Sequence, residues 1–94
     1  MLRKGTISEL YLGRVVATPC VLDAVPRSEL LAALMRHRHC DWGAVSDRDW
    51  AANDHALTHG GRVLSAYVAG NKTRFWIITE ANRAATTVLL PSDY

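Results

Sequence analysis

The sequence lacks a long hydrophobic run. No stretch approaches the roughly 20 apolar residues that are needed to cross a bilayer. Glu9 and Arg14 interrupt the segment that follows the basic residues Arg3 and Lys4, so the pattern of a secretory signal peptide is missing. We therefore expect a soluble, cytoplasmic protein that does not engage a membrane.

Cysteine is scarce. The chain has 2 cysteines, Cys20 and Cys40, which lie in different segments and do not form a CxxC motif. Two thiols are too few for the disulfide framework of a small secreted domain. A reduced compartment is therefore expected, in agreement with a cytoplasmic location.

An excess of charge of one sign is also missing. The 11 Lys and Arg residues are interleaved with 9 Asp and Glu residues, which gives a net charge of +2. A dedicated nucleic-acid-binding protein usually has a clear basic stripe. The charge pattern permits contact with nucleic acid but does not favour it.

The motifs of common catalytic sites are absent as well. We find no phosphate-binding glycine loop, no pair of carboxylates at a usable spacing and no nucleophile beside its base. The sequence leaves enzymatic activity open and favours a protein without it. No cofactor is expected.

The last third of the chain carries the strongest structural pattern. Residues 62–69 (RVLSAYVA), 73–80 (TRFWIITE) and 85–91 (ATTVLLP) alternate with period two and are separated by turn residues. They predict three consecutive antiparallel strands, a C-terminal meander. With 94 residues, of which 49% are hydrophobic, residues 1–94 are expected to form a single domain.

The first two thirds of the chain predict a short strand and two helices. Arg14 to Ala17 is expected to be a strand, and Pro19 to Ala24 a short helix that Thr18 caps. Pro26 starts another helix, which should end near His39. The apolar side chains of this helix predict one stripe that faces the core: Leu30, Leu31, Leu34 and Met35. In the turn that follows, Trp42 is expected to plug the edge of the core.

A further helix has clear start and stop signals. Ser46 is the expected N-cap, with Asp49 three residues later as its reciprocal partner, and Gly60 is the expected stop. The fold class is therefore α+β: a short N-terminal strand, two to three helices, then a three-stranded antiparallel meander. The middle strand is apolar on both faces, so we expect helices on one face and the N-terminal segment or a partner subunit on the other. This pattern indicates a homodimer.

Histidines and one cysteine suggest a metal site, which has a simpler alternative. The candidate ligands are His37, His39, Cys40, His55 and His59. The spacing of His55 and His59 can place two imidazoles on one zinc ion. However, imidazolium groups in the last turn of a helix also interact favourably with the helix dipole, and the HALTH segment lacks the glutamate of HExxH. We therefore expect no bound metal.

Two surfaces are candidates for partner binding. The first is an arginine-bearing sheet surface that consists of Arg62, Tyr67, Arg74 and Arg83. It could hold RNA phosphates, although Arg74 could instead pair with Glu80 and Arg62 could merely follow the helix end. The second is an acidic helix face that consists of Asp47, Asp49 and Asp54. Such a face is typical of a solvated helix and also of an inhibitor of a basic protein.

The sequences of four segments resemble a known family. These segments are GRVVATPCVL (13–22), DWGAVSDRDWAANDHAL (41–57), GRVLSAY (61–67) and FWIITEANRAATTVLLPSDY (75–94). They resemble small uncharacterised proteins that are carried on bacterial plasmids, phages and integrated elements and are sometimes labelled as type I restriction subunits. The resemblance covers most of the chain from Gly13 onward.

This resemblance implies an accessory role in conflict between a mobile element and its host. We expect a non-enzymatic inhibitor of the anti-CRISPR or anti-restriction type, which binds a host protein or ribonucleoprotein complex. A second reading comes from the order of elements, which is similar to that of small ribonuclease toxins of the RelE/ParE type. In such a toxin, Arg62, Tyr67, Arg74 and Tyr94 would contact RNA. A third reading is a structural dimeric module.

Overall fold

The computed structural model describes residues 9–94 as an α+β fold, in agreement with the predicted class. The elements follow one another along the chain in this order: β1 (Arg14–Ala17), α1 (Pro19–Ala24), α2 (Arg27–Arg38), α3 (Asp47–His59), β2 (Val63–Val68), β3 (Arg74–Thr79), β4 (Ala85–Leu89) and the 3₁₀ turn η1 (Pro91–Asp93). None of the helices in this part of the chain is long and apolar enough to span a bilayer.

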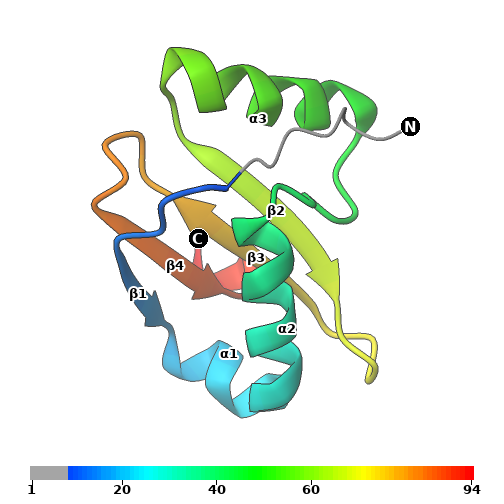
Figure 1. Cartoon of the computed structure of the whole chain (residues 1–94). Helices are drawn as coiled ribbons and strands as arrows, with labels where there is room; N and C mark the ends of the chain where they lie inside the picture. The colour runs from blue at the N-terminus through cyan, green and yellow to red at the C-terminus, as the bar shows by residue number, and fades with distance from the viewer. Residues whose placement is uncertain (1–8) are drawn as a thin grey trace.

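The four strands form one mixed sheet in the order β1-β4-β3-β2 (Figure 1). Strands β2, β3 and β4 are the predicted antiparallel meander. Strand β1 adds to this meander in parallel with β4, with Arg14 opposite Ala85 and Ala17 opposite Val88. Of the two predicted covers for the second face, the N-terminal segment does not take that place within the described residues, because β1 extends the sheet sideways; cover by a partner subunit stays a prediction.

Helices α1 and α2 cover one face of the sheet, the side nearest the viewer in Figure 1. Their buried side chains form one core cluster with those of β2, β3 and β4. The cluster consists of Val21, Val25, Leu30, Ala33, Tyr67, Ala69, Phe75, Ile77 and Val88. Alternation along the strands brings Tyr67, Phe75 and Ile77 to the same side.

The buried stripe of α2 differs from the predicted one. Leu30 is buried and Leu34 is half-buried, but Leu31 and Met35 are 63% and 45% exposed. The stripe runs instead through Leu30, Ala33, Leu34 and His37. This set follows the spacing i, i+3, i+4, i+7, with a histidine in the last position. The prediction failed because it counted only apolar residue types.

Helix α3 and the preceding turn form a second cluster at the other end of the same face. This cluster consists of Leu10, Trp42, Ala56 and Val63. Trp42 was predicted to plug the edge of the core, and its side chain is fully buried. Its indole N–H donates a hydrogen bond to Asp54 at 3.0 Å, which gives the buried donor a partner.

The local signals around α3 act as predicted. The Ser46 hydroxyl accepts a hydrogen bond from the Asp49 backbone N–H at 3.1 Å. At the other end Gly60 adopts a φ of 84°, which permits the chain to leave the helix sharply. These signals place Asn53, on the second turn of the helix, beside the outer edge of β2.

The outer edge of β2 is closed by α3 and by the preceding turn. The Asn53 side chain donates to the Leu64 carbonyl at 2.8 Å and accepts from the Leu64 N–H at 3.2 Å. Next along the edge, the Ala66 N–H donates to the Trp42 carbonyl and the Ala66 carbonyl accepts from the Ala44 N–H. The side-chain amide therefore takes the place that a further strand would occupy, and this edge is protected against pairing.

We expect Asn53→Ala to lower the free energy of unfolding by about 2 kcal/mol, because two hydrogen bonds of about 1 kcal/mol each are lost. Asn53→Asp should be at least as damaging, since a carboxylate cannot donate to the Leu64 carbonyl. Denaturant unfolding measures both changes. The matched control is Ala51→Asn at an exposed position of α3, which should cost less than about 1 kcal/mol. Equal losses at positions 51 and 53 would contradict the role of Asn53.

Candidate functional site

The most exposed face of the sheet is the one opposite α1 and α2, which we call the open face. Along each strand its side chains alternate with the buried ones of the core. They are Leu64, Ala66, Val68, Arg74, Trp76, Ile78, Thr87 and Leu89. Ile78 and Leu89 are buried, whereas Val68 is 53% exposed and Arg74 is exposed. The open face is therefore a partly apolar surface with a charged end.

Two aromatic rings and an arginine meet on the open face. The Tyr94 ring packs against Trp76 edge to face, with 5.7 Å between ring centroids. The Arg62 guanidinium lies 5.5 Å from the centre of the Tyr94 ring and donates a hydrogen bond to its hydroxyl. Tyr94 is nevertheless 68% exposed, so the three side chains present an amphipathic surface to solvent.

A shallow hollow of about 310 Å³ continues this surface toward α3. It is lined by Asp49, Ala52, Asn53, Arg62 and Leu64. Two of the predicted partner-binding residues, Asp49 of the acidic helix face and Arg62 of the sheet, thus border one depression. The acidic and basic candidate surfaces, which the sequence left separate, come together here.

Arg83 has a structural environment instead. Its side chain is half-buried and donates to the Gly61 carbonyl at 2.6 Å and to the Ala56 carbonyl at 3.0 Å. Both carbonyls belong to the end of α3 and to the turn after it, which need donors. Arg83 also adopts a φ of 61°, so the β3–β4 turn aims it at α3. We assign Arg83 to the end of this helix and not to the open face.

The other predicted residues are distributed over the molecule. Asp47 and Asp54 are both exposed, and Asp54 accepts the bond from Trp42. Tyr67 is only 3% exposed and lies on the covered face of the sheet, opposite Arg62 and Arg74. Its ring cannot stack on a partner from there. Of the predicted set, Arg62 and Asp49 share one accessible hollow, whereas Arg74 lies at the other end of the β2–β3 pair, opposite Val68.

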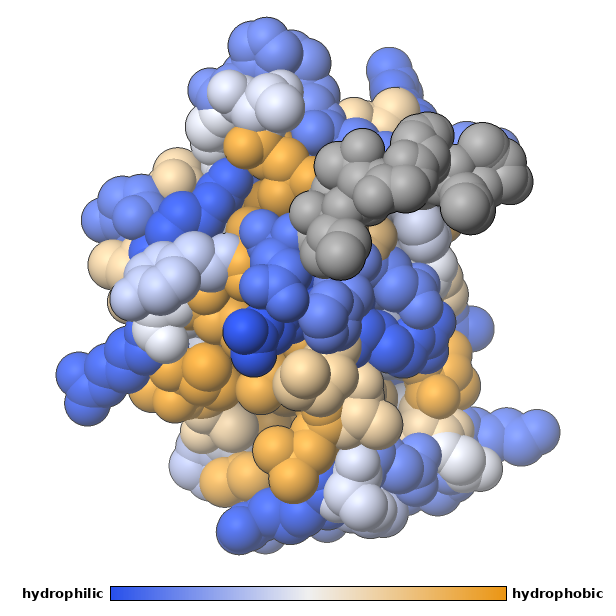
Figure 2. Space-filling model, viewed as in Figure 1, coloured by the Kyte–Doolittle hydropathy of each residue, from blue (hydrophilic) through white to orange (hydrophobic). Residues whose placement is uncertain are grey.

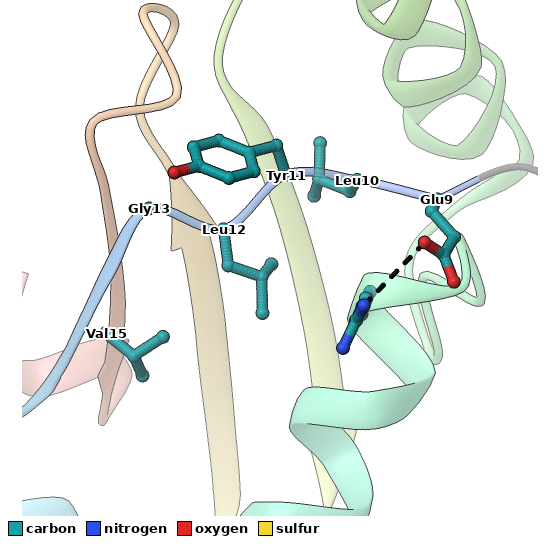
Figure 3. A pocket seen from close by; sticks show the side chains of 7 residues that line it. Glu9, Leu10, Tyr11, Leu12, Gly13 and Val15 are labelled. Carbon is teal, nitrogen blue, oxygen red and sulfur yellow. Dashed lines mark ion pairs between the residues drawn. The ribbon is translucent and has the colours of Figure 1, made fainter.

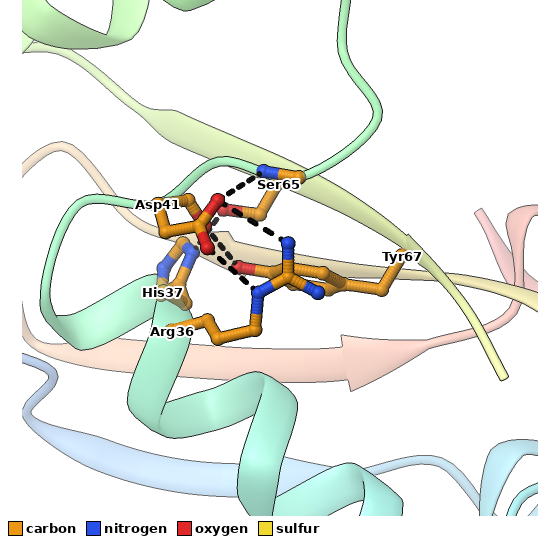
Figure 4. A network of polar contacts seen from close by, with 6 residues as sticks. Arg36, His37, Asp41, Ser65 and Tyr67 are labelled. Carbon is orange, nitrogen blue, oxygen red and sulfur yellow. Dashed lines mark hydrogen bonds and ion pairs between the residues drawn. The ribbon is translucent and has the colours of Figure 1, made fainter.

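Tyr67 belongs to a polar network at the end of α2 (Figure 4). Its hydroxyl donates to the Asp41 backbone carbonyl at 2.7 Å, and the Arg36 guanidinium lies 4.8 Å from the centre of its ring. Arg36 also pairs with the Asp41 carboxylate at 2.8 Å, which holds the pKa of that carboxyl below its usual range. Burial raises the pKa of Tyr67 to about 12. The network fastens the helix end to β2.

Beside this network, the side chain of His37 on α2 is fully buried and faces β2 and β3. Its Nδ1 lies 2.5 Å from the Ser65 hydroxyl and its Nε2 lies 2.8 Å from the Thr79 hydroxyl. The Thr79 hydroxyl contacts that of Thr86 at 2.7 Å, and Thr86 donates to the Leu12 carbonyl. The chain of contacts joins α2, three strands and the N-terminal segment.

The pair Ser65 and His37 has the contact of a nucleophile and its base, which the sequence reasoning missed. Both side chains are completely buried, and the second nitrogen of His37 meets the Thr79 hydroxyl where a catalytic triad would have a carboxylate. Burial lowers the pKa of His37 to about 4, so the ring is neutral at pH 7. The pair is a structural contact within the core. The position of His37 seven residues after Leu30 could have revealed it.

The remaining histidines among the candidate metal ligands lie in two separate places, His39 at the end of α2 and His55 with His59 on α3. His39 is 3.9 Å from the Glu9 carboxylate. The rings of His55 and His59 stack on each other on α3, with centroids 3.9 Å apart. Within residues 9–94 no three His, Cys, Asp or Glu side chains gather as metal ligands.

Comparison with protein-family models, characterised proteins and solved structures finds no match to this chain. The resemblance to proteins of mobile elements therefore stays a prediction. The case for a function depends on the open face and on the burial of Ser65 and His37, whose contact lies inside the core.

We expect the stability of the protein to fall as the pH falls from 6.5 to 4. Over this range the unfolded chain binds a proton at His37 that the folded chain excludes. Proton binding therefore stabilises the unfolded state relative to the folded state. Relative to His37→Gln, the wild type should lose about 3 kcal/mol between pH 7 and pH 4. Denaturant unfolding at several pH values measures the difference.

His37→Gln is the control because it keeps a polar side chain but does not titrate. Asp41 and Asp93 have lowered pKa values in the folded protein, so their protonation at acid pH also destabilises it. This contribution is the same in the wild type and in His37→Gln. Parallel pH profiles of the two proteins would show that His37 is accessible to protons in the folded state.

Proposed function

We propose that this protein is a non-enzymatic binding protein that inhibits a host defence complex, of the anti-CRISPR or anti-restriction type. It covers a protein surface of that complex with its open face. The observation that carries the proposal is the group formed by Trp76, Tyr94 and Arg62 beside the exposed Val68 and Arg74. Tryptophan, tyrosine and arginine are the residue types that dominate binding energy in protein interfaces.

The arrangement of the group favours a protein partner. Arg62 is held by Tyr94, so less conformational freedom is lost when the surface is covered. Val68 and Leu64 provide apolar area on either side of Ala66, and Arg74 adds positive charge at the end of β3. At the other end of the open face, Asp49 and Arg62 line the same hollow. A partner with an acidic patch beside an apolar one would complement the open face.

The proposal also agrees with the position of the polar groups. Ser65 and His37, which are in contact, lie inside the core where no substrate can reach them. An inhibitor that acts by covering a surface needs no catalytic residue. The resemblance to proteins carried on mobile elements supports a target in host defence, since such elements gain from blocking it.

The ribonuclease toxin is the alternative, and it has less support. Its candidate residues are Arg62, Tyr67, Arg74 and Tyr94, but Tyr67 lies on the covered side of the sheet with its hydroxyl bonded to the Asp41 backbone. A tyrosine in that position cannot exchange a proton with a substrate on the open face. Arg62 and Tyr94 remain close together and could still contact RNA as a binding surface.

Capture of the target from host lysate by the tagged protein tests the proposal. We expect a large protein complex to be retained, and Arg74→Glu should reduce its recovery at least about tenfold, because the reversed charge would place a carboxylate against the acidic patch of the partner. Arg48→Glu on the exposed side of α3 is the matched control and should leave capture unchanged. Both variants should unfold at the same denaturant concentration as the wild type.

Other outcomes would contradict the proposal. Recovery of the protein alone at ordinary salt would remove the support for an inhibitor. Growth arrest on expression, abolished by Arg74→Ala and accompanied by loss of RNA, would favour the toxin.

A further inference from the structure

The two edges of the sheet differ, and the edge at β1 is open. The backbone N–H groups of Arg14 and Thr18 donate to Ala84 and Val88, toward β4. Backbone groups of successive residues in a strand point to alternate sides. The N–H and C=O groups of Val15 and Ala17 therefore point away from β4. Within residues 9–94, β1 pairs only with β4, so no strand lies on its outer side (Figure 1).

The contacts that protect the outer edge of β2 have no counterpart at β1 in residues 9–94. Asn53 and the turn at Gly43 occupy the outer edge of β2. Strand β1 has no proline between Arg14 and Ala17 and no charged side chain after Arg14. An edge strand without such protection is a template for pairing with another strand.

Apolar side chains gather around this open edge. Of the eight large apolar side chains that are exposed in the described part of the chain, half lie between residues 11 and 22: Tyr11 (75% exposed), Val15 (43%), Val16 (40%) and Leu22 (38%). Figure 2 shows apolar surface, in orange, over the part of the molecule where β1, α1 and α2 lie. Exposed apolar groups beside free backbone groups mark a surface that is suited to a partner.

A hollow lies beside the same edge, on the side of the helices. It has a volume of about 410 Å³ and is lined by residues 9–13, Val15 and Arg38. Figure 3 shows the side chains of Leu12 and Val15 pointing to the same side of the chain, while Glu9 reaches toward α2. The edge therefore offers both backbone groups and a recess of mixed polarity next to them.

We propose that β1 pairs with β1 of a second copy of this chain in an antiparallel, two-fold symmetric dimer. In the register that matches the free groups, Val15 of one copy faces Ala17 of the other, and these pairs exchange four hydrogen bonds in total. Val16 then faces Val16 of the second copy. The pairing is limited to five positions, because Gly13, with a φ of 63°, bends the chain before Arg14 and Pro19 begins α1 after Thr18.

The charges around β1 favour this register. Arg14 of one copy lies opposite Thr18 of the other, and the Thr18 hydroxyl donates to the Asp93 carboxylate at 2.7 Å. The guanidinium thereby comes within reach of a carboxylate whose pKa is lowered and which is charged at pH 7. The two copies of Arg14 are four residues apart along the strands, so they do not repel each other strongly.

The dimer joins the two four-stranded sheets into one sheet of eight strands. The two-fold axis is perpendicular to the sheet, so both open faces lie on the same side of the assembly. If the open face binds a target, the dimer presents two such faces and gains avidity. Dimer formation itself does not depend on the proposed function.

Sedimentation equilibrium of the full chain from about 10 to about 500 µM tests the proposal, because a five-residue strand pair is a small interface and its affinity is expected to be micromolar. The wild type should pass from monomer to dimer. Val16→Lys should raise the dissociation constant at least about tenfold, since two ammonium groups would face each other. Arg14→Glu should also weaken the dimer, because it places a carboxylate beside Asp93.

The matched control is Val68→Lys. Val68 is an exposed valine on the opposite edge strand, β2, and on the same open side of the sheet as Val16. It should leave the monomer–dimer equilibrium unchanged. Circular dichroism and denaturant unfolding establish that all variants fold.

Oxidation of Val16→Cys tests the register directly. Opposed residues in a non-hydrogen-bonded antiparallel pair have Cα atoms about 4.5 Å apart, which suits a disulfide. We expect a covalent dimer linked at position 16, identified by mass spectrometry in a Cys20→Ser background, because Cys20 is exposed. Val68→Cys in the same background should remain a monomer.

Three results would overturn the proposal. They are a monomer at all concentrations, a dimer that Val68→Lys weakens and Val16→Lys does not, and a disulfide that forms at position 68 but not at position 16. These outcomes are distinct from failure of the proposed function, because they use the purified protein alone. Val16→Lys should still capture the target as a monomer, whereas Arg74→Glu should dimerise normally.

Discussion

The rest of the structure depends on the buried contacts of His37. The ring joins α2 to β2 through Ser65 and to β3 through Thr79, and Thr86 continues the connection to β4 and to Leu12. A buried polar group without a partner is strongly destabilising, so these contacts permit one arrangement of helix and sheet. In the described part of the chain, no buried side-chain nitrogen or oxygen is left without a hydrogen bond.

This arrangement makes the sheet asymmetric in two ways. Because α1, α2 and α3 all use the face that carries Phe75 and Ile77, the opposite face is left to the aromatic rings of Trp76 and Tyr94. Because Asn53 closes the edge at β2, the edge at β1 is the one that residues 9–94 leave open. The protein therefore separates two surfaces: a face suited to a target and an edge suited to a second copy.

Much of the fold could be predicted because its signals are local. The period of two in residues 62–89 depends only on neighbouring residues, and so do the cap at Ser46 and the stop at Gly60. The stripe on α2 could not be predicted from apolar residue types, because Leu31 and Met35 are exposed and His37 is buried. A histidine can enter a core only where acceptors and donors from other strands meet it, and these lie 28 and 42 residues away in the chain.

The sequence by itself determined the order, type and limits of the elements, because turn residues, caps and periodicity act over a few residues. Only the tertiary structure decided the site. It placed Tyr67 inside and Arg62 outside, used Arg83 to cap α3, and set β1 beside β4 in parallel. These outcomes depend on which surfaces meet. Burial and the pairing of distant polar groups determine which surfaces pack together, and a local sequence pattern does not contain this information.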